Sequence, residues 1–192
     1  MAGLVISTRP DCIAEPVWEL LAELQEGGPL WLELGLQSAH DRTLAAMGRG
    51  HDVACFDAAV RRAHELGLKV VAHVILGLPG EEPEHTEATA AHLAGLGVWG
   101  VKLHHLMILQ GAALAREYAA GRVACWSLDK YALAAARFVA RLPREMVIHR
   151  LAADPGQDNL LAPDWAADKD GILSALAQAM VQNHLEQGSL YP

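Results

Sequence analysis

Apolar and polar positions along this chain fall into blocks that switch between the two periods of regular structure. Short runs rich in Val, Ile and Leu stop at glycine or polar residues, and longer segments with one apolar helical face follow them. The runs predict strands at 5–7, 30–36, 69–76, 101–106 and 145–151. The intervening segments predict helices at 17–25, 53–66, 80–96, 112–119 and 127–142, a helical turn from residue 38, and a final amphipathic helix at 169–185.

This order predicts an α/β fold, because strands alternating with helices of such length require right-handed crossovers and a parallel sheet. The run at 69–76 is nearly all apolar and β-branched, as in a parallel strand buried on both faces. Five strands are too few to close an eight-stranded barrel, so an open or partial barrel fits better. We expect a single domain over 1–192, with βα units up to about residue 152 and a C-terminal loop and helix at 153–192.

Composition says more about the cellular compartment of the protein than about its function. The formal charge of −8 argues against a surface that binds nucleic acid or anionic membranes nonspecifically. The longest apolar stretches are too short to span a bilayer, and the first residues lack the pattern of a signal peptide. Cys12, Cys55 and Cys125 lie far apart and are expected to pack as small apolar residues in a reducing compartment. A cytoplasmic protein with no membrane partner is expected.

The first candidate site is the turn that follows the apolar run at 69–76. Gly77 permits close approach of the backbone, and Leu78 and Pro79 lead into a helix whose first N–H groups are unpaired. The main chain of this loop could hold the face or edge of an adenine. A tight βα turn without any ligand explains the same residues, since glycine and proline are common there.

A second group of polar residues lies in and just after the strand at 30–36. Glu33 falls inside the strand, where a carboxylate is costly unless it is paired, so it indicates a polar pocket. The alternative is an edge position that faces solvent. Gln37 and Ser38 come directly after the strand and would lie at its carboxyl end.

Arginine and histidine residues near the strand ends complete the candidates. Arg49 is suited to a carboxylate, although an arginine on a loop is more often simply solvated. His73 interrupts an apolar strand, and such a histidine is more often a core residue than a catalyst. His104 and His105 point to opposite faces, so one lines a pocket and the other meets the helices. No metal-binding motif is found, and no catalytic residue can be assigned.

Several segments, taken in order, resemble the radical SAM superfamily, and in particular its YhcC-type group. The core of that group is related to the catalytic subunit of Elongator and to oxygen-independent coproporphyrinogen oxidase. The resemblance covers almost the whole chain, and its motifs are specific mainly in combination. The segments are STRPD (7–11), LELGLQSAHD (32–41), RGHD (49–52), HVILGLPGE (73–81), VIHRL (147–151) and NLLAP (159–163).

The resemblance implies a partial (β/α)6 barrel that binds S-adenosylmethionine against a 4Fe-4S cluster. It implies that Gln37 and Ser38 approach the ribose or the methionine end of the cofactor, and that Arg49 pairs with its carboxylate. It further implies that Glu33 and His105 line the barrel interior.

The same resemblance implies roles for the second strand end. Gly77, Leu78 and Pro79 would form the loop under adenine, with His73 near the ribose. The substrate stays unidentified, because this core is shared by tRNA-modifying and porphyrin-forming enzymes.

The chain also departs from the family pattern. The Cys-x3-Cys-x2-Cys loop that holds the cluster is missing, and the first strand matches the third strand of the family, so the first two βα units are absent. We therefore expect the C-terminal part of a radical SAM-type enzyme, which carries part of the cofactor pocket. Alone it would neither bind the cluster nor generate the adenosyl radical, and it would be inactive.

Two other interpretations stay open. The chain could be a non-catalytic binding or assembly module that pairs through the exposed edge strand at 5–7, with a missing N-terminal half or a second copy as its partner. It could also be an enzyme of another class, such as a lyase, that uses His73, Glu33 and His105 in one pocket.

Overall fold

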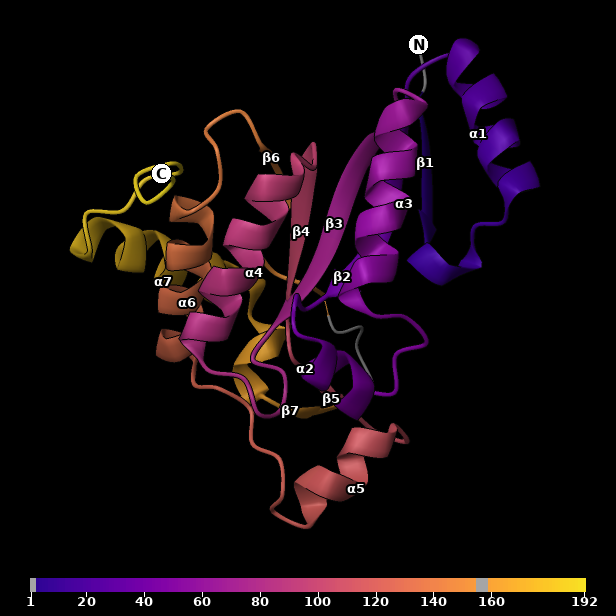
Figure 1. The fold of residues 1–192 in the computed structure, drawn as a ribbon. Helices are drawn as coiled ribbons and strands as arrows, with labels where there is room; N and C mark the ends of the chain where they lie inside the picture. The colour runs from indigo at the N-terminus through magenta and orange to yellow at the C-terminus, as the bar shows by residue number, and fades with distance from the viewer. Residues whose placement is uncertain (1–2, 155–158) are drawn as a thin grey trace.

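Five parallel strands form the central sheet of the computed structural model, which describes residues 3–154 and 159–192 (Figure 1). Their order in the sheet is β1-β2-β3-β4-β6, and each pairing is parallel. The α/β fold with a parallel sheet is therefore confirmed. The strands are β1 (Leu4–Thr8), β2 (Leu30–Gln37), β3 (Lys69–Leu76), β4 (Gly100–His105) and β6 (Val147–Arg150).

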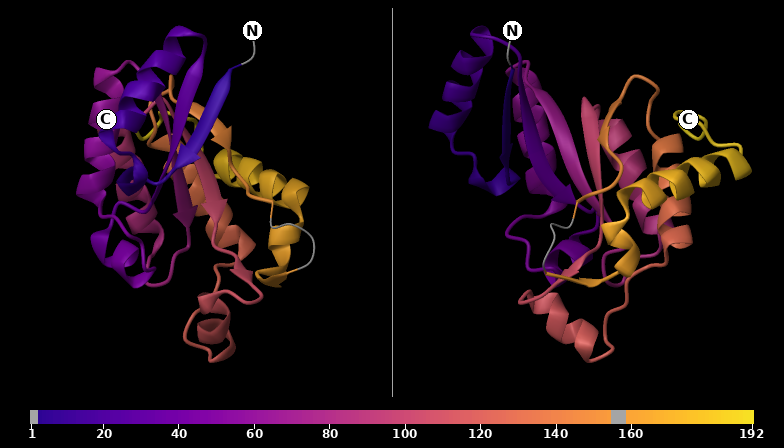
Figure 2. Two further views of the ribbon diagram at one scale, coloured as in Figure 1. Left: turned by 90° about the vertical axis from the view of Figure 1, so that its right-hand side faces the viewer. Right: turned by 180° about the vertical axis from the view of Figure 1, so that it is seen from behind.

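Helices connect these strands and cover one face of the sheet. In Figure 1, α3 and α4 lie in front of the strands, and the right-hand view of Figure 2 shows β1 to β3 from behind with no described helix over them. This one-sided cover is what right-handed crossovers between neighbouring parallel strands produce. The helices are α1 (Glu15–Glu26), α2 (Asp41–Ala46), α3 (Val53–Glu65), α4 (Pro83–Leu96), α5 (Ala113–Ala119), α6 (Leu128–Ala140) and α7 (Lys169–Gln182).

The two faces of the sheet differ in chemistry because side chains alternate along each strand. The face toward the helices is apolar, and its residues are at most 1% exposed: Leu32, Leu34, Val70, Ala72, Val74, Val101 and Leu103. They pack against fully buried helix residues such as Phe56, Leu93 and Phe138. The opposite face carries Ser7, Glu33, His73 and Lys102, and we call it the inner face.

A β-bulge interrupts the end of β2. Gly35 pairs with His73, but the next paired residue is Gln37, which lies opposite Val74. Gln37 has a φ of 72°, a conformation that is uncommon for a residue with a side chain. A bulge adds one residue to its strand and changes the direction of the side chains that follow. The bulge therefore sets where Gln37 and Ser38 point.

A small antiparallel two-stranded sheet lies at the carboxyl end of the main sheet and was not expected from the sequence. β5 (Ile108–Leu109) pairs with β7 (Leu160–Ala162), which joins the C-terminal segment to the loop after β4. Leu78, Leu106, Ile108 and Ala162 form a second buried apolar cluster there. The helix α5 projects below this cluster in Figure 1 and buries none of its residues.

The local signals for helix ends are largely confirmed. Asp52 caps α3, because its Oδ1 accepts a hydrogen bond of 2.8 Å from the backbone N–H of Cys55. Gly67 follows α3 with a φ of 69°, as a C-terminal glycine should. The last helix ends at Gln182 rather than at residue 185, and the last strand of the sheet is β6 rather than the longer 145–151.

The predictions that the individual cysteines pack as small apolar residues have different outcomes. Cys125 packs against the second apolar cluster, but Cys12 is exposed, so the prediction that it packs as a small apolar residue was wrong. Its position on the short 3-10 helix Pro10–Cys12 places it at the surface. Within the described part of the chain, no helix combines the length and apolar character needed to cross a bilayer.

Candidate functional site

The carboxyl ends of β2 and β3 are joined by a buried hydrogen bond. Ser38, 1% exposed, donates from its Oγ to Oε1 of Glu81, 4% exposed, at 2.5 Å. The Ser38 hydroxyl also accepts the backbone N–H of His40 at 3.1 Å. Glu81 lies in the loop after β3, and it was not among the candidate residues. The sequence offered one signal for it, since it directly follows the Gly-Leu-Pro-Gly turn.

Two predicted site residues, Gln37 and Arg49, lie close to each other at the bulge. A Cβ added to Gly35 would lie 2.5 Å from Nε2 of Gln37 and 3.2 Å from Nη2 of Arg49, so a larger residue there would displace the ends of these two side chains. Arg49 Nη2 lies 3.3 Å from Nε2 of His51. The Nε of Arg49 is buried and has no hydrogen-bond partner in the described part of the chain. Burial lowers the pKa of Arg49 and nearby Arg9 adds to the effect, whereas the charge of Asp11, which is ion-paired with Arg9, opposes it.

Glu33 is the centre of a polar network on the inner face. Its carboxylate accepts hydrogen bonds from Ser7 Oγ at 2.8 Å, from His73 Nε2 at 2.9 Å, and from the Lys102 ammonium. Burial by itself raises the pKa of Glu33, but these three donors outweigh it and lower the pKa to about 2. Glu33 is therefore ionised at pH 7, and the polar pocket interpretation of this residue is favoured over an edge facing solvent.

The neighbouring histidine rings on this face are neutral at pH 7. Burial lowers the pKa of His73, and its contact with Glu33 opposes the effect only in part. Burial also lowers the pKa of His104, to about 3, with a further contribution from the charge of Arg150. The rings of His73 and His104 lie 5.8 Å apart, and the guanidinium of Arg150 lies against the His104 ring. Lys102 and Arg150 were not predicted as site residues, and His104 was considered only as the alternative to His105.

His105 lies on the other face of β4, so the expectation that it lines the barrel interior was wrong. Its ring is 4.9 Å from that of Trp165 and 5.5 Å from that of Tyr131, which belongs to α6. Neighbouring residues of a strand point to opposite faces, so His104 lies on the inner face and His105 does not. Among the described residues, His73 and Glu33 lie together on the inner face but His105 does not join them. A lyase that uses all three side chains in one pocket is therefore not supported.

The loop after β3 is fixed by packing. Gly77 has a φ of 84°, and a Cβ there would lie 3.2 Å from the ring of Trp126. Leu78 is only 2% exposed, because it belongs to the second apolar cluster. Pro79 lies at the rim of a cavity of about 410 Å³, which extends along the loop toward Trp126 and Lys130. Gly77 and Pro79 thus line the cavity, while the buried side chain of Leu78 fixes the loop to the second apolar cluster.

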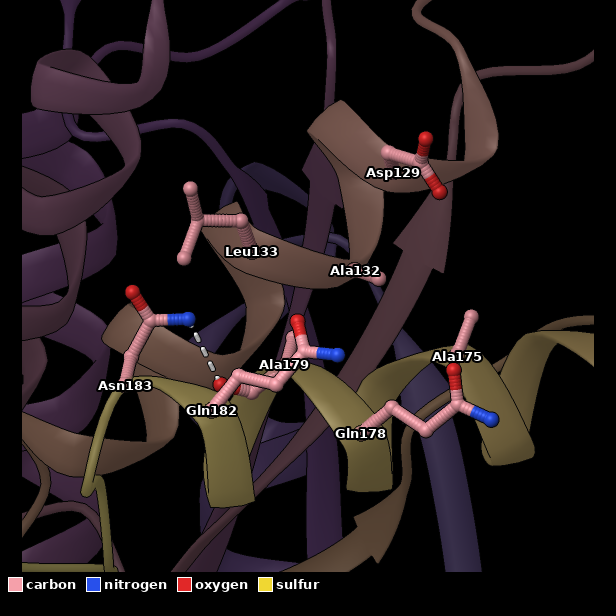
Figure 3. Close-up of a pocket in the computed structure, with 8 residues that line it drawn as sticks. All are labelled: Asp129, Ala132, Leu133, Ala175, Gln178, Ala179, Gln182 and Asn183. Atoms are coloured by element: carbon pink, nitrogen blue, oxygen red, sulfur yellow. Dashed lines mark hydrogen bonds between the residues drawn. The ribbon is translucent and has the colours of Figure 1, made fainter.

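Another groove lies away from these strand ends. It runs between α6 and α7 with a volume of about 440 Å³, and Figure 3 shows Asp129, Gln178 and Gln182 along it. None of the predicted site residues lines this groove. The only hydrogen bond drawn between its residues is a local one, from Nδ2 of Asn183 to the backbone oxygen of Ala179.

Comparison with known families agrees with this architecture. The family model described as the Radical SAM superfamily matches residues 2–93, and the model described as the Radical SAM C-terminal domain matches residues 98–182. The chain belongs to the radical SAM superfamily. It is similar to protein YhcC of Escherichia coli strain K12, with 41% identity over 170 residues, which cover 88% of this chain and 55% of YhcC. The chain thus spans about half the length of this curated relative.

Two solved structures share the fold. Elp3 from the archaeon Methanocaldococcus infernus, with its N-terminus deleted, gives a TM-score of 0.78 at 21% identity, over 96% of this chain and 43% of that one. The radical SAM enzyme coproporphyrinogen III oxidase (HemN) from Escherichia coli gives a TM-score of 0.50 at 22% identity, over 67% of this chain and 29% of that one. At these identities the likeness shows the fold alone.

Proposed function

We propose that this chain is part of a radical SAM enzyme and binds S-adenosylmethionine at the carboxyl ends of β2 and β3. The observation that carries the proposal is the junction of these two strand ends, where Ser38 bonds to Glu81 beside the bulge at Gly35 and Gln37. Membership of the radical SAM superfamily supports it. Ligands of open α/β folds bind outside the carboxyl ends of the strands, which is where this junction lies.

The residues at this junction fit the chemical groups of the cofactor. Arg49 is partly buried and in no ion pair within the described residues, so it suits the methionine carboxylate. Gln37 and Ser38 supply polar groups for the ribose or the methionine end. Gly77 offers its backbone and Pro79 an apolar ring to adenine, as a glycine-rich strand end allows.

The inner face supports the ribose side of the same site. His73 and Glu33 are joined by a hydrogen bond, and both belong to the network that includes Lys102. We assign His73 to the neighbourhood of the ribose, with Glu33 fixing its ring. Leu78 takes no direct part in this proposal, because its side chain is buried in the second apolar cluster.

A 4Fe-4S cluster does not fit the residues that are described. Cys12 follows β1, Cys55 lies on α3, and Cys125 precedes α6. Residues 3–154 and 159–192 contain no group of three or more His, Cys, Asp or Glu side chains arranged to hold a metal ion. We therefore propose that cluster ligands come from outside this sequence and that these 192 residues alone do not generate the adenosyl radical.

The exposed edge of the sheet supports a role for a further strand. Among the strands that the structure describes, β1 pairs only with β2, and its Leu4 and Val5 are 44% and 43% exposed. We propose that an N-terminal half of a longer protein pairs with this edge, and that a second copy does so when the chain is alone.

The three free cysteines of the chain suit a reducing compartment, so we propose that the protein lies in the cytoplasm.

The same edge supports a second candidate function, a non-catalytic assembly module derived from this fold. The two functions differ in what they require of Arg49. An assembly module needs β1 but has no use for a partly buried arginine without an anion, whereas the cofactor site depends on it.

Titration calorimetry with S-adenosylmethionine tests the proposal on the 192-residue chain. We expect weak, saturable binding that Arg49→Gln reduces about 10-fold or more, because a charge-assisted hydrogen bond to carboxylate contributes about 1.5–3 kcal/mol. Arg61→Gln is the control, since Arg61 is exposed on α3. No heat at millimolar cofactor, or equal affinity in the two variants, would favour the assembly module.

A further inference from the structure

Two arginines stand apart from the others in the described chain. Arg49 and Arg150 are partly buried, yet neither forms an ion pair with a described carboxylate. The other partly buried arginines, Arg62 and Arg141, pair with Glu15 and Glu87. A guanidinium removed from water without an anion is costly, which indicates that both positions are shaped for an anion that is not part of these residues.

The surroundings of Arg150 leave its charge uncompensated. Its guanidinium lies against the neutral His104 ring, which can accept a hydrogen bond but carries no charge. The one carboxylate of the inner-face network, Glu33, is already occupied by Ser7, His73 and Lys102. The Nε of Arg150 is buried and has no hydrogen-bond partner among the residues described.

Arg49 and Arg150 lie at different places along the sheet. Arg49 follows the end of β2, whereas Arg150 ends β6, and β3 and β4 lie between these strands. Three strand spacings separate β2 from β6, or about 14 Å. S-adenosylmethionine has one carboxylate, and Arg49 accounts for it in the proposed function. The second guanidinium therefore calls for a second anion.

We infer that Arg150, with His104 beside it, forms a subsite for an anionic group of the substrate, a phosphate or a carboxylate. The inference rests on the proposed function, which makes the inner face the place where cofactor and substrate meet. Arginine matches both groups with two parallel N–H donors, and the neutral His104 ring does not compete for the anion.

Titration of the isotope-labelled chain with inorganic phosphate or acetate, followed by NMR of the histidine rings, tests the inference. At constant ionic strength we expect saturable shifts of the His104 and His73 resonances. Arg150→Gln should weaken them at least 10-fold, and Arg150→Lys should weaken them less because it keeps the charge. Arg144→Gln is the control, since Arg144 is exposed just before β6 and its nearest carboxylate is 3.9 Å away.

The outcomes separate the sources of the anion. A stronger response to phosphate assigns a substrate that carries phosphate, and a stronger response to acetate assigns one that carries a carboxylate. Shifts that do not saturate, or that are equal in Arg150→Gln and Arg144→Gln, overturn the inference. Circular dichroism of both Arg150 variants establishes that they are folded, and Arg150→Lys serves as the test if Arg150→Gln is not.

Cofactor titration separates this inference from the proposed function. Arg150→Gln should bind S-adenosylmethionine within about 2-fold of the wild type. If it loses the cofactor as Arg49→Gln does, Arg150 belongs to the cofactor site and the substrate subsite is excluded. If the wild type binds phosphate at Arg150 but no cofactor, the proposed function fails and the anion subsite stands.

Discussion

Buried ionisable residues in this protein follow two different rules. Glu33 keeps its charge because three donors surround it, and its pKa falls to about 2. His105 has the opposite setting, since both of its ring nitrogens are buried without a hydrogen-bond partner among the described residues. Burial, with the charge of Arg150, lowers the pKa of His105 to about 4. The surroundings of Glu33 thus stabilise its charged form, whereas those of His105 favour its neutral form.

His105 should therefore make the protein sensitive to acid. In the unfolded chain its pKa is about 6.5 and in the folded chain about 4, so the unfolded state binds more protons between these values. The free energy of unfolding then falls as the pH falls from 6.5 to 4, by up to about 3 kcal/mol from this residue. His105→Phe should remove that part of the pH dependence, as measured by urea unfolding at both pH values.

The control for this experiment is His64→Phe, because His64 is exposed at the end of α3. It should leave the acid dependence unchanged. An acid dependence in His105→Phe equal to that of the wild type would show that His105 is not the group responsible.

At the scale of elements, the strands of the parallel sheet were predictable from the sequence. The pairing of β5 with β7 and the side-chain contacts between neighbouring strands were not. Each strand of the sheet lies in or beside a short run of apolar residues, which the sequence displays directly. The two-stranded sheet of β5 and β7 was missed because two short strands about fifty residues apart carry no period of their own. Lys102 and Arg150 were missed for a related reason, since only the register between strands brings them to Glu33 and His104.

The loop after β3 gives a prediction about its glycine. Gly77→Ala should lower the free energy of unfolding by about 1–2 kcal/mol, because alanine is strained at a φ of 84° and its Cβ would press on Trp126. Gly95→Ala in α4 is the matched control, since nothing lies within 4 Å of its added Cβ. That variant should gain up to about 1 kcal/mol from helix propensity.

Urea unfolding of both glycine variants measures the difference. The interpretation of the loop as a rigid, packed turn fails if Gly77→Ala is as stable as Gly95→Ala. Cofactor titration of a folded Gly77→Ala variant then reports whether the backbone at this position also contacts the ligand.

At the scale of the molecule, the exposed edge of β1 governs how the chain behaves in solution. Leu4 and Val5 present apolar side chains on a strand whose outer edge pairs with no other strand in residues 3–154 and 159–192, a combination that favours pairing with another strand. Val5→Lys should reduce self-association at least several-fold in sedimentation experiments, because lysine on an edge opposes strand pairing. A wild type that remains monomeric at all concentrations would exclude pairing between copies.

Val181→Lys is the control for edge pairing. Val181 is 76% exposed on α7, so the added charge is the same but the position is remote from β1. Its association should match that of the wild type.

The bulge in β2 has a consequence for how this region can vary in length. The extra residue at Gly35 to Gln37 sets the direction of the side chains after it, so the bond between Ser38 and Glu81 depends on the residue count of β2. Deleting one residue before Ser38 would leave every apolar contact of Leu32 and Leu34 in place and yet turn the serine away from the glutamate. Homologous sequences that keep this cofactor pocket should therefore tolerate substitutions in β2 far more readily than single-residue insertions or deletions.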